Sequence, residues 1–256
     1  STTFRLKDLT CDLYLPTQPA EAPPRPALIF AHGGSFIAGA KENREIESLA
    51  RYLATRGYIV MNINYRLMKD NPPAPVPYDI SLPRLIHALA TDMKTATRYL
   101  RANTATYNAD PHRIAGGGVS TGASGALATG LSDEAAFSND GPDHPVPPEN
   151  HPEQPSKPNA IVDFCGNASF LYDQYDPNDP PILVVHGTND QQFGTSFYNA
   201  LALKKACEKN HIPIVFCPLE GGTHNIWPGI YNGQTILEIT HTFLENHLPA
   251  AKQSAN

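Results

Sequence analysis

A serine flanked by glycines lies at the centre of the stretch G-V-S-T-G, residues 118–122. An apolar run precedes it and a run of small residues follows, so we expect a sharp turn from a strand into a helix at Ser120. A serine on such a turn raises its hydroxyl above the edge of a sheet, where it can attack a carbonyl carbon. The alternative is a glycine-rich turn with a capping serine. Ser120 is therefore the candidate nucleophile.

A second glycine-rich loop, H-G-G-S-F at residues 32–36, follows another apolar run. Adjacent glycines let backbone N–H groups face inward without obstruction by side chains. Acyl transfer needs such donors where negative charge develops on a carbonyl oxygen. A tight turn leaving a strand is the alternative. We expect His32 to hold this loop rather than to act as a base.

Two further loops supply an acid and a base. The stretch H-G-T-N-D at residues 186–190 places Asp190 just beyond an apolar run, and E-G-G-T-H at residues 220–224 brings in His224. A carboxylate can orient a histidine, which then takes the proton of a serine. An Asx-turn and a solvated loop histidine are the alternatives, and Asp163 is a second candidate acid, although it falls inside a strand-like run. The order serine, acid, histidine argues against coincidence.

Strand-like and helix-like segments alternate along the chain. The apolar runs are Ala27–Ala31, Tyr58–Ile63, Arg113–Val119, Ala160–Cys165, Ile182–Val185 and Pro213–Cys217. The segments with helical periodicity are Glu42–Arg56, Pro83–Asn103, Gly122–Leu131, Ser196–Asn210 and Thr235–His247. This pattern predicts an α/β fold, a doubly wound and mostly parallel sheet, with Thr10–Leu15 as an antiparallel edge strand. Because functional loops follow the carboxyl ends of such strands, the four candidate loops share one edge.

Length and composition limit the alternatives. The 256 residues suit one large α/β domain, residues 1–256, with a proline-rich acidic stretch at 133–158 expected to be an irregular surface insertion. A net charge of −6 disfavours nucleic-acid binding. No apolar stretch approaches the roughly 20 residues of a membrane span. Few lysines and many Pro, Asn and Gln residues favour a secreted or periplasmic protein over a cytoplasmic one, and the oligomeric state stays open.

The four cysteines give no sign of a metal site, because none belongs to a C-x-x-C pair. Cys207 and Cys217 lie close enough in sequence for a disulfide to join a helix to the next strand. Two ordinary half-buried thiols are the interpretation that we favour. The expected chemistry needs no metal and no organic cofactor.

Several of these stretches together resemble the carboxylesterase and lipase group of α/β hydrolases. They are H-G-G-S-F, G-V-S-T-G and H-G-T-N-D, with N-Y-R-L at 64–67 and D-P-H-R-I at 110–114. Relatives with an H-G-G-x loop include hormone-sensitive-lipase-like esterases, bacterial feruloyl and acetyl esterases and kynurenine formamidases. The resemblance runs from about Leu13 to Leu248. It implies Ser120 as nucleophile, His224 as base and Asp190 as orienting acid, with backbone oxyanion donors at Gly34, Ser35 and Thr121.

The chain departs from that group at several positions. Ser35 replaces a third glycine, Val119 stands where many relatives carry an acidic residue, Thr121 replaces the usual alanine, and Ala123 replaces the usual second glycine. None of these changes removes a catalytic group, but they leave the subfamily and the substrate open. Arg66 and Asp92 match positions that often pair beneath the nucleophile loop in relatives.

We expect a serine carboxylic-ester hydrolase that acts through an acyl-enzyme on short-chain or small acyl esters, including those of a bulky or polysaccharide alcohol. An amide hydrolase (formamidase or peptidase) on the same triad and a non-catalytic hydrolase-fold binding protein are the alternatives. Residues 167–181 are too short and too rich in Pro and Asp for a helical cap. The proline-rich stretch Lys69–Asp79 is expected to wall an open cleft. Candidate pocket residues are Phe36, Tyr65, Phe170, Phe193, Ile226 and Trp227.

Overall fold

A seven-stranded sheet forms the centre of the protein. The computed structural model describes residues 8–17, 23–72, 81–140, 144–171 and 174–250. The strands run in the order β1 (Cys11–Tyr14), β3 (Ile59–Ile63), β2 (Arg25–Ala31), β4 (Ala109–Val119), β5 (Ala160–Phe164), β6 (Ile182–Gly187) and β7 (Ile214–Leu219). All neighbours are parallel except β1, which pairs with β3 in antiparallel fashion. The predicted fold class and the antiparallel edge strand are both confirmed.

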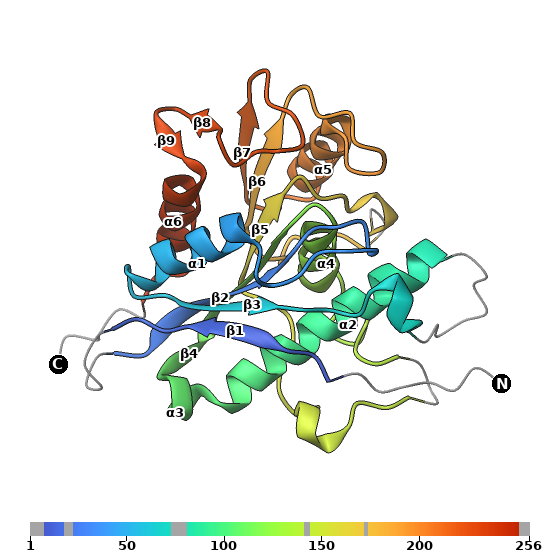
Figure 1. Cartoon of the computed structure of the whole chain (residues 1–256), viewed down its shortest axis with the longest axis vertical. Coiled ribbons are helices and arrows are strands. Elements are labelled where there is room, and N and C mark those ends of the chain that lie inside the picture. Colours follow the sequence, from blue (N-terminus) through green and yellow to red (C-terminus); the bar gives the residue numbers. More distant parts are fainter. Residues whose placement is uncertain (1–7, 18–22, 73–80, 141–143, 172–173, 251–256) are drawn as a thin grey trace.

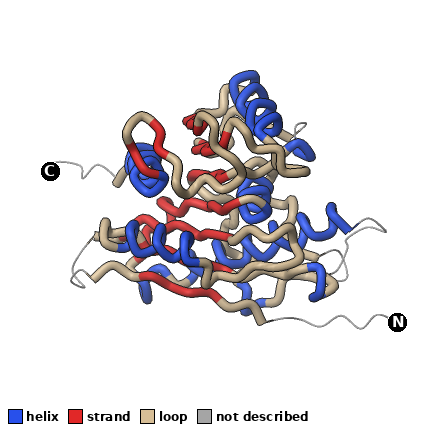
Figure 2. Tube along the Cα trace, turned by 45° about the horizontal axis from the view of Figure 1, so that its top comes forward, coloured by secondary structure: helices blue, strands red, loops and turns tan. Residues whose placement is uncertain are grey.

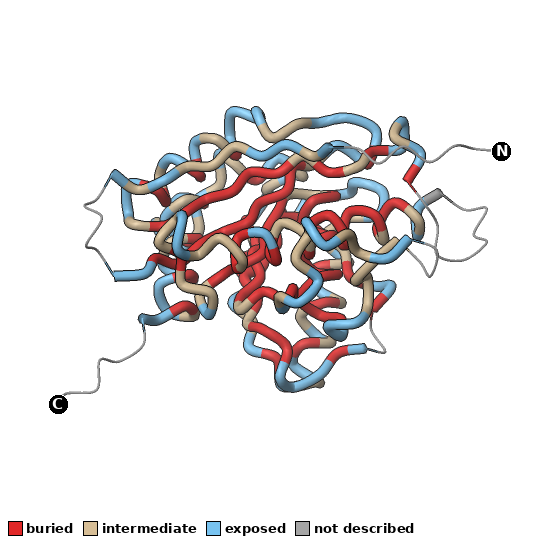
Figure 3. The backbone as a smooth tube through the Cα atoms, turned by 90° about the horizontal axis from the view of Figure 1, so that it is seen from below, coloured by how far each residue is buried: buried red, intermediate tan, exposed pale blue. Residues whose placement is uncertain are grey.

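Helices cover both faces of the sheet (Figures 1 and 2). The face bearing Leu28 and Phe30 packs against α1 (Arg44–Ala54) and α6 (Ile236–His247). The opposite face packs against α2 (Ser81–Ala102), α4 (Thr121–Gly130) and α5 (Phe197–Lys209). Because both faces are covered, β2, β3, β5 and β6 are buried along their whole length, as Figure 3 shows for the centre of the molecule. This explains their continuous apolar sequences.

Several short elements were not predicted, because they span too few residues to show a hydrophobic periodicity. They are α3 (Thr104–Tyr107), the hairpin of β8 (Ile230–Tyr231) and β9 (Gln234–Thr235), and the 3₁₀ turns η1 (Met68–Asp70), η2 (Pro148–Asn150) and η3 (Ser169–Leu171). All four cysteines are free thiols, which confirms the interpretation without a disulfide, although Cys207 and Cys217 are buried and not half-buried. Most of the stretch predicted to wall the cleft, Lys69–Asp79, lies outside the described residues.

The described residues of the segment 133–158 form no regular element except η2, and they are firmly attached to α2. The ammonium group of Lys94 donates hydrogen bonds to the carbonyl oxygens of Asp133 and Glu134, each at 3.0 Å. The guanidinium of Arg101 donates to the carbonyl of Pro155 at 2.7 Å. Cationic side chains that satisfy loop carbonyls in this way fix a segment that has no hydrogen-bonded ladder of its own.

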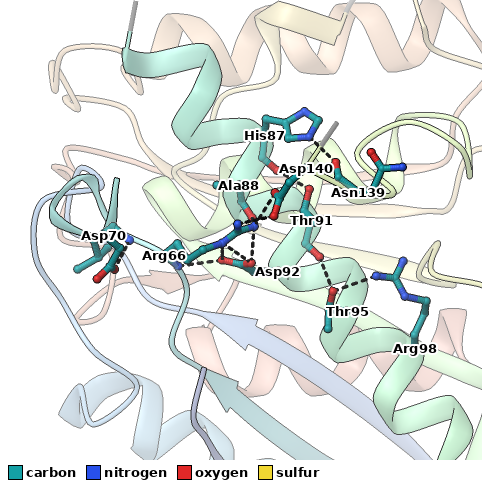
Figure 4. Close-up of polar contacts among 11 residues, drawn as sticks. Arg66, Asp70, His87, Ala88, Thr91, Asp92, Thr95, Arg98, Asn139 and Asp140 are labelled. Carbon is teal, nitrogen blue, oxygen red and sulfur yellow. Dashed lines mark hydrogen bonds and ion pairs between the residues drawn. The ribbon is translucent and has the colours of Figure 1, made fainter. Parts of the chain in front are cut away.

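A buried cluster joins this segment to the turn after β3 (Figure 4). Arg66 bonds to Asp92 of α2 at 2.8 Å, which confirms the expected pair. The same guanidinium contacts Asp140 at 2.6 Å, a partner that the sequence did not indicate. One arginine held by two carboxylates fixes the turn after β3 to α2 and to the segment 133–158.

Candidate active site

The candidate nucleophile lies on a strained turn between β4 and α4. Ser120 has φ 55° and ψ −118°, a backbone conformation that L-residues avoid and that characterises a nucleophile elbow. Its N–H donates to the carbonyl of Phe164 at 2.7 Å. A Cβ atom at Gly118 would lie 2.2 Å from the backbone of Gly122, and one at Gly122 would lie 2.2 Å from the carbonyl oxygen of Ala31. Both glycines are therefore required by the close packing of the turn.

The candidate acid holds the candidate base directly. His224 Nδ1 lies 2.7 Å from Asp190 Oδ2, and the Asp190 carboxylate is buried. The other carboxylate oxygen, Oδ1, accepts the backbone N–H of Gln192 at 2.8 Å. Because a carboxylate can only accept, Nδ1 of His224 carries the proton and Nε2 is left free to take one. The pairing of acid and base is the one expected from the sequence.

A second histidine, which the sequence reasoning missed, bonds to the same carboxylate oxygen. His186 Nε2 lies 2.8 Å from Asp190 Oδ2 and its side chain is fully buried. Burial lowers the pKa of His186 and outweighs the opposing effect of Asp190, so the ring is neutral and donates its single proton to the acid. The stretch H-G-T-N-D contains His186 four residues before Asp190, and this spacing is the signal that could have identified it.

Asp163, the other candidate acid, lies apart from this network. It is fully buried in β5, and its Oδ1 accepts the backbone N–H of Gly166 at 2.7 Å. Burial raises the pKa of Asp163 to about 7, against the lowering effect of the Gly166 N–H. The structure therefore assigns Asp190, and not Asp163, to His224.

Asp163→Asn is expected to increase stability progressively as the pH rises, with little effect on activity. A carboxyl group whose pKa is raised by folding stabilises the protein fully below its ordinary pKa, and this contribution is lost as the pH rises through about 7. Asparagine keeps the oxygen that accepts the Gly166 N–H and cannot ionise. The melting temperature of the variant minus that of the parent should therefore grow by a few degrees between pH 5 and pH 8. A difference that is constant with pH would contradict this account.

The loop expected to supply oxyanion donors has an unusual backbone. Gly34, Ser35 and Phe36 have φ values of 129°, 53° and 61°. The position of Ser35 differs from expectation: its N–H donates to the hydroxyl of Thr121 at 2.9 Å and so is already engaged. His32 bonds through Nδ1 to the carbonyl of Gly33 at 2.7 Å, which agrees with a role in holding the loop.

A cleft of about 850 Å³ opens at this edge of the sheet. Ser120 and His224 both line it, beside the loop that follows β2. Its remaining walls combine the polar side chains of Glu42, Asn43, Gln192 and Asn225 with the apolar side chains of Ala40, Val119 and Trp227. Among the described residues of this lining, Trp227 is the one large apolar side chain. The site thus joins the candidate nucleophile, the candidate base and the loop expected to supply backbone donors in an open cleft.

Of the six candidate pocket residues, Trp227 alone is part of this lining. Phe36, Tyr65 and Ile226 are buried in the core instead, and the hydroxyl of Tyr65 donates to the carbonyl of His32 at 3.0 Å. Phe193 is 98% exposed on the loop after β6, next to Gln192, and Phe170 is also exposed. Neither contributes to the cleft wall. The buried aromatic residues are packing residues.

Comparisons with known proteins give a family and two relatives for this chain. The BD-FAE family model matches residues 11–176. Esterase LipC of Mycobacterium tuberculosis is 30% identical over 65% of this chain and 34% of that protein. Juvenile hormone esterase of Heliothis virescens is 32% identical over 46% of this chain and 20% of that protein. The chain therefore spans about a third or less of the length of these relatives.

Solved structures share the fold along nearly the whole chain. Native Est2, a thermophilic esterase of Thermogutta terrifontis, has a TM-score of 0.75 and 21% identity, covering 96% of this chain and 91% of that one. Its propionate-bound form has a TM-score of 0.75 and 22% identity, with coverages of 96% and 93%. None of the described helices is long and apolar enough to cross a membrane. With the family model matched over more than half of its length, this chain belongs to the BD-FAE family and has an α/β-hydrolase fold.

Proposed function

We propose that this protein is a carboxylesterase-type serine hydrolase. The observation that carries the proposal is the hydrogen bond of 2.7 Å between His224 and the buried Asp190, in a cleft that His224 lines together with Ser120. A neutral imidazole whose Nδ1 proton is held by a carboxylate presents a free Nε2 to a serine hydroxyl. Placement of that serine on a strained strand-to-helix turn supports the same role.

The reaction then follows from these positions in two stages. Ser120 Oγ attacks the ester carbonyl carbon while its proton passes to His224 Nε2, and the negative charge on the carbonyl oxygen is met by backbone N–H groups. The imidazolium gives its proton to the departing alkoxide, which leaves as an alcohol, and Ser120 retains the acyl group. Water then attacks the acyl-enzyme, His224 takes its proton and returns it to Ser120, and the acid departs.

The shape of the site favours small acyl groups. Between β5 and β6 the described residues form a single 3₁₀ turn, η3, and no α-helix that could roof the cleft. The walls offer few apolar side chains to a long alkyl chain. Est2 has been solved in propionate-bound and butyrate-bound forms, which points to similarly short acyl groups here. An open cleft also leaves room for a bulky alcohol such as a polysaccharide.

A panel of p-nitrophenyl esters from acetate to palmitate, with matching p-nitroanilides, tests both parts of the proposal. We expect kcat/KM to be highest for acyl chains of four carbons or fewer and to show no jump at the micelle threshold, because the described residues form no helical cap that would have to open. Anilides should react far more slowly than esters. Faster hydrolysis of anilides would favour the amide-hydrolase alternative. A maximum at ten carbons or more, or activation at a lipid interface, would show that long chains are accommodated after all.

A further inference from the structure

The loop after β2 is exposed, and its backbone conformation has to be imposed from outside. Three successive residues, Gly34, Ser35 and Phe36, have φ values in the left-handed region, which non-glycine residues avoid. Gly34 and Ser35 are solvent-exposed, whereas the Phe36 ring is buried beneath them. Without contacts to the rest of the protein, such a loop would relax to other conformations. Its amide groups would then lose their fixed direction.

Two hydrogen bonds tie the residues with positive φ, 34–36, to other parts of the chain. Phe36 accepts the N–H of Met68 at 2.8 Å, which secures the far side of the loop. On the side of the nucleophile, Ser35 donates its N–H to the hydroxyl oxygen of Thr121 at 2.9 Å. Thr121 is the first residue of α4 and directly follows Ser120. It is only 5% exposed and is not part of the cleft lining, so its hydroxyl lies behind the loop rather than in front of it.

The backbone amides that remain available lie on either side of this contact. Within the described residues, no acceptor takes the N–H of Gly34. The N–H of Thr121 belongs to the first turn of a helix and has no partner within that helix. The N–H of Ser35, in contrast, is engaged by the Thr121 hydroxyl. The Thr121 hydroxyl therefore holds the loop that carries the free amide of Gly34, next to the free amide of Thr121 itself.

We infer that Thr121 is a positioning residue for the oxyanion hole, its hydroxyl holding the loop after β2 so that the amides of Gly34 and Thr121 converge on the substrate oxygen. This inference rests on the proposed esterase function. It makes Ser35 a structural tie instead of a third donor to the substrate. The role of the Thr121 hydroxyl is independent of the peptide N–H of Thr121, which every residue except proline would supply at this position.

Oxyanion donors act on charge that exists only near the transition state, so their displacement lowers kcat and leaves KM nearly unchanged. Loss of a donor costs about 10²–10³-fold in kcat, and a displaced donor should cost less. Thr121→Val keeps the shape and the peptide N–H but removes the acceptor for Ser35. We expect its kcat to fall by roughly 10–100-fold with KM within about twofold of the parent. Thr121→Ser restores an acceptor and should recover most of the lost kcat.

Thr129→Val is the matched control. Thr129 lies on the same helix, is equally buried, and its hydroxyl donates to the carbonyl of Ala126 at 2.8 Å, away from the cleft. Active enzyme is counted by fluorophosphonate titration, and thermal melts confirm folding, so that kcat refers to folded sites. A trifluoromethyl ketone, which forms a tetrahedral adduct with the serine, should lose affinity for Thr121→Val by about the factor lost in kcat. A competitive product carboxylate should bind with unchanged affinity.

Each outcome decides the question. If the parent neither hydrolyses esters nor reacts with the fluorophosphonate, the proposed function itself fails. If the parent is active and Thr121→Val matches it in kcat and in ketone affinity, the inference fails while the function stands. A rise in kcat for Thr121→Val would also overturn it, because the hydroxyl would then be withholding the Ser35 amide from the substrate. Equal losses in Thr121→Ser and Thr121→Val would exclude the hydrogen bond as the cause.

Discussion

Ser120→Ala is expected to fold as the parent does and to lose ester hydrolysis by about a million-fold, because removal of one member disables a triad that acts as a unit. Alanine fits the same strained turn, since its Cβ occupies the position of the serine Cβ. The backbone N–H that donates to Phe164 is also kept. The measurement is kcat/KM on p-nitrophenyl acetate, together with covalent labelling by a fluorophosphonate.

Ser132→Ala provides the control for this variant. Ser132 is a buried serine just beyond the other end of α4, and its hydroxyl donates to the carbonyl of Ala128 at 2.6 Å. This variant should lose some stability and keep its activity and its labelling. If Ser120→Ala were labelled as strongly as the parent, another residue would be the nucleophile, and the elbow would have only a structural role.

The sequence was sufficient to predict which loops lie together at the candidate site, because loops at the carboxyl ends of parallel strands must meet at one edge. Asp190 and His224 are 34 residues apart in sequence, and their contact follows from the pairing of β6 with β7 alone. The same rule separated Asp190 from Asp163, which lies within its strand. Topology, read from an apolar pattern, thus carries most of the information about which catalytic groups can meet.

The walls of the cleft could not be predicted in the same way, since proximity in sequence does not fix the direction of a side chain. Phe36 is part of the loop after β2, yet its positive φ accompanies a ring that is buried in the core. Ile226 and Trp227 are neighbours, and only Trp227 reaches the cleft. Backbone conformation, which composition and periodicity do not encode, decides these cases.

Side-chain contacts between distant parts of the chain could not be predicted from the sequence either. The attachment of Asp140 to Arg66 depends on the path of an irregular segment, for which no period exists. The bond between Ser35 and Thr121 joins two motifs that were each recognised in the sequence. Neither motif could show that the Thr121 hydroxyl would accept a hydrogen bond from the Ser35 amide.

Asp190→Asn is expected to lower turnover by about four orders of magnitude, since it favours the wrong tautomer of His224, the proposed base. In the parent, Oδ2 accepts N–H donors from both His224 and His186, while Oδ1 accepts the N–H of Gln192. An asparagine has a single oxygen for these three donors. If its NH₂ faces the histidines, His224 must accept at Nδ1 and carry its proton on Nε2, where it cannot take the proton of Ser120.

The opposite orientation of that asparagine would set its NH₂ against the N–H of Gln192, where a buried donor would lack an acceptor. Either orientation therefore costs activity or stability. Asp179→Asn is the control, because Asp179 is equally buried but pairs with Lys157 at 2.6 Å, outside the cleft lining. It should destabilise the protein and leave kcat on p-nitrophenyl acetate close to that of the parent. A larger loss of kcat in Asp163→Asn than in Asp190→Asn would transfer the role of orienting acid to β5 and refute the triad drawn here.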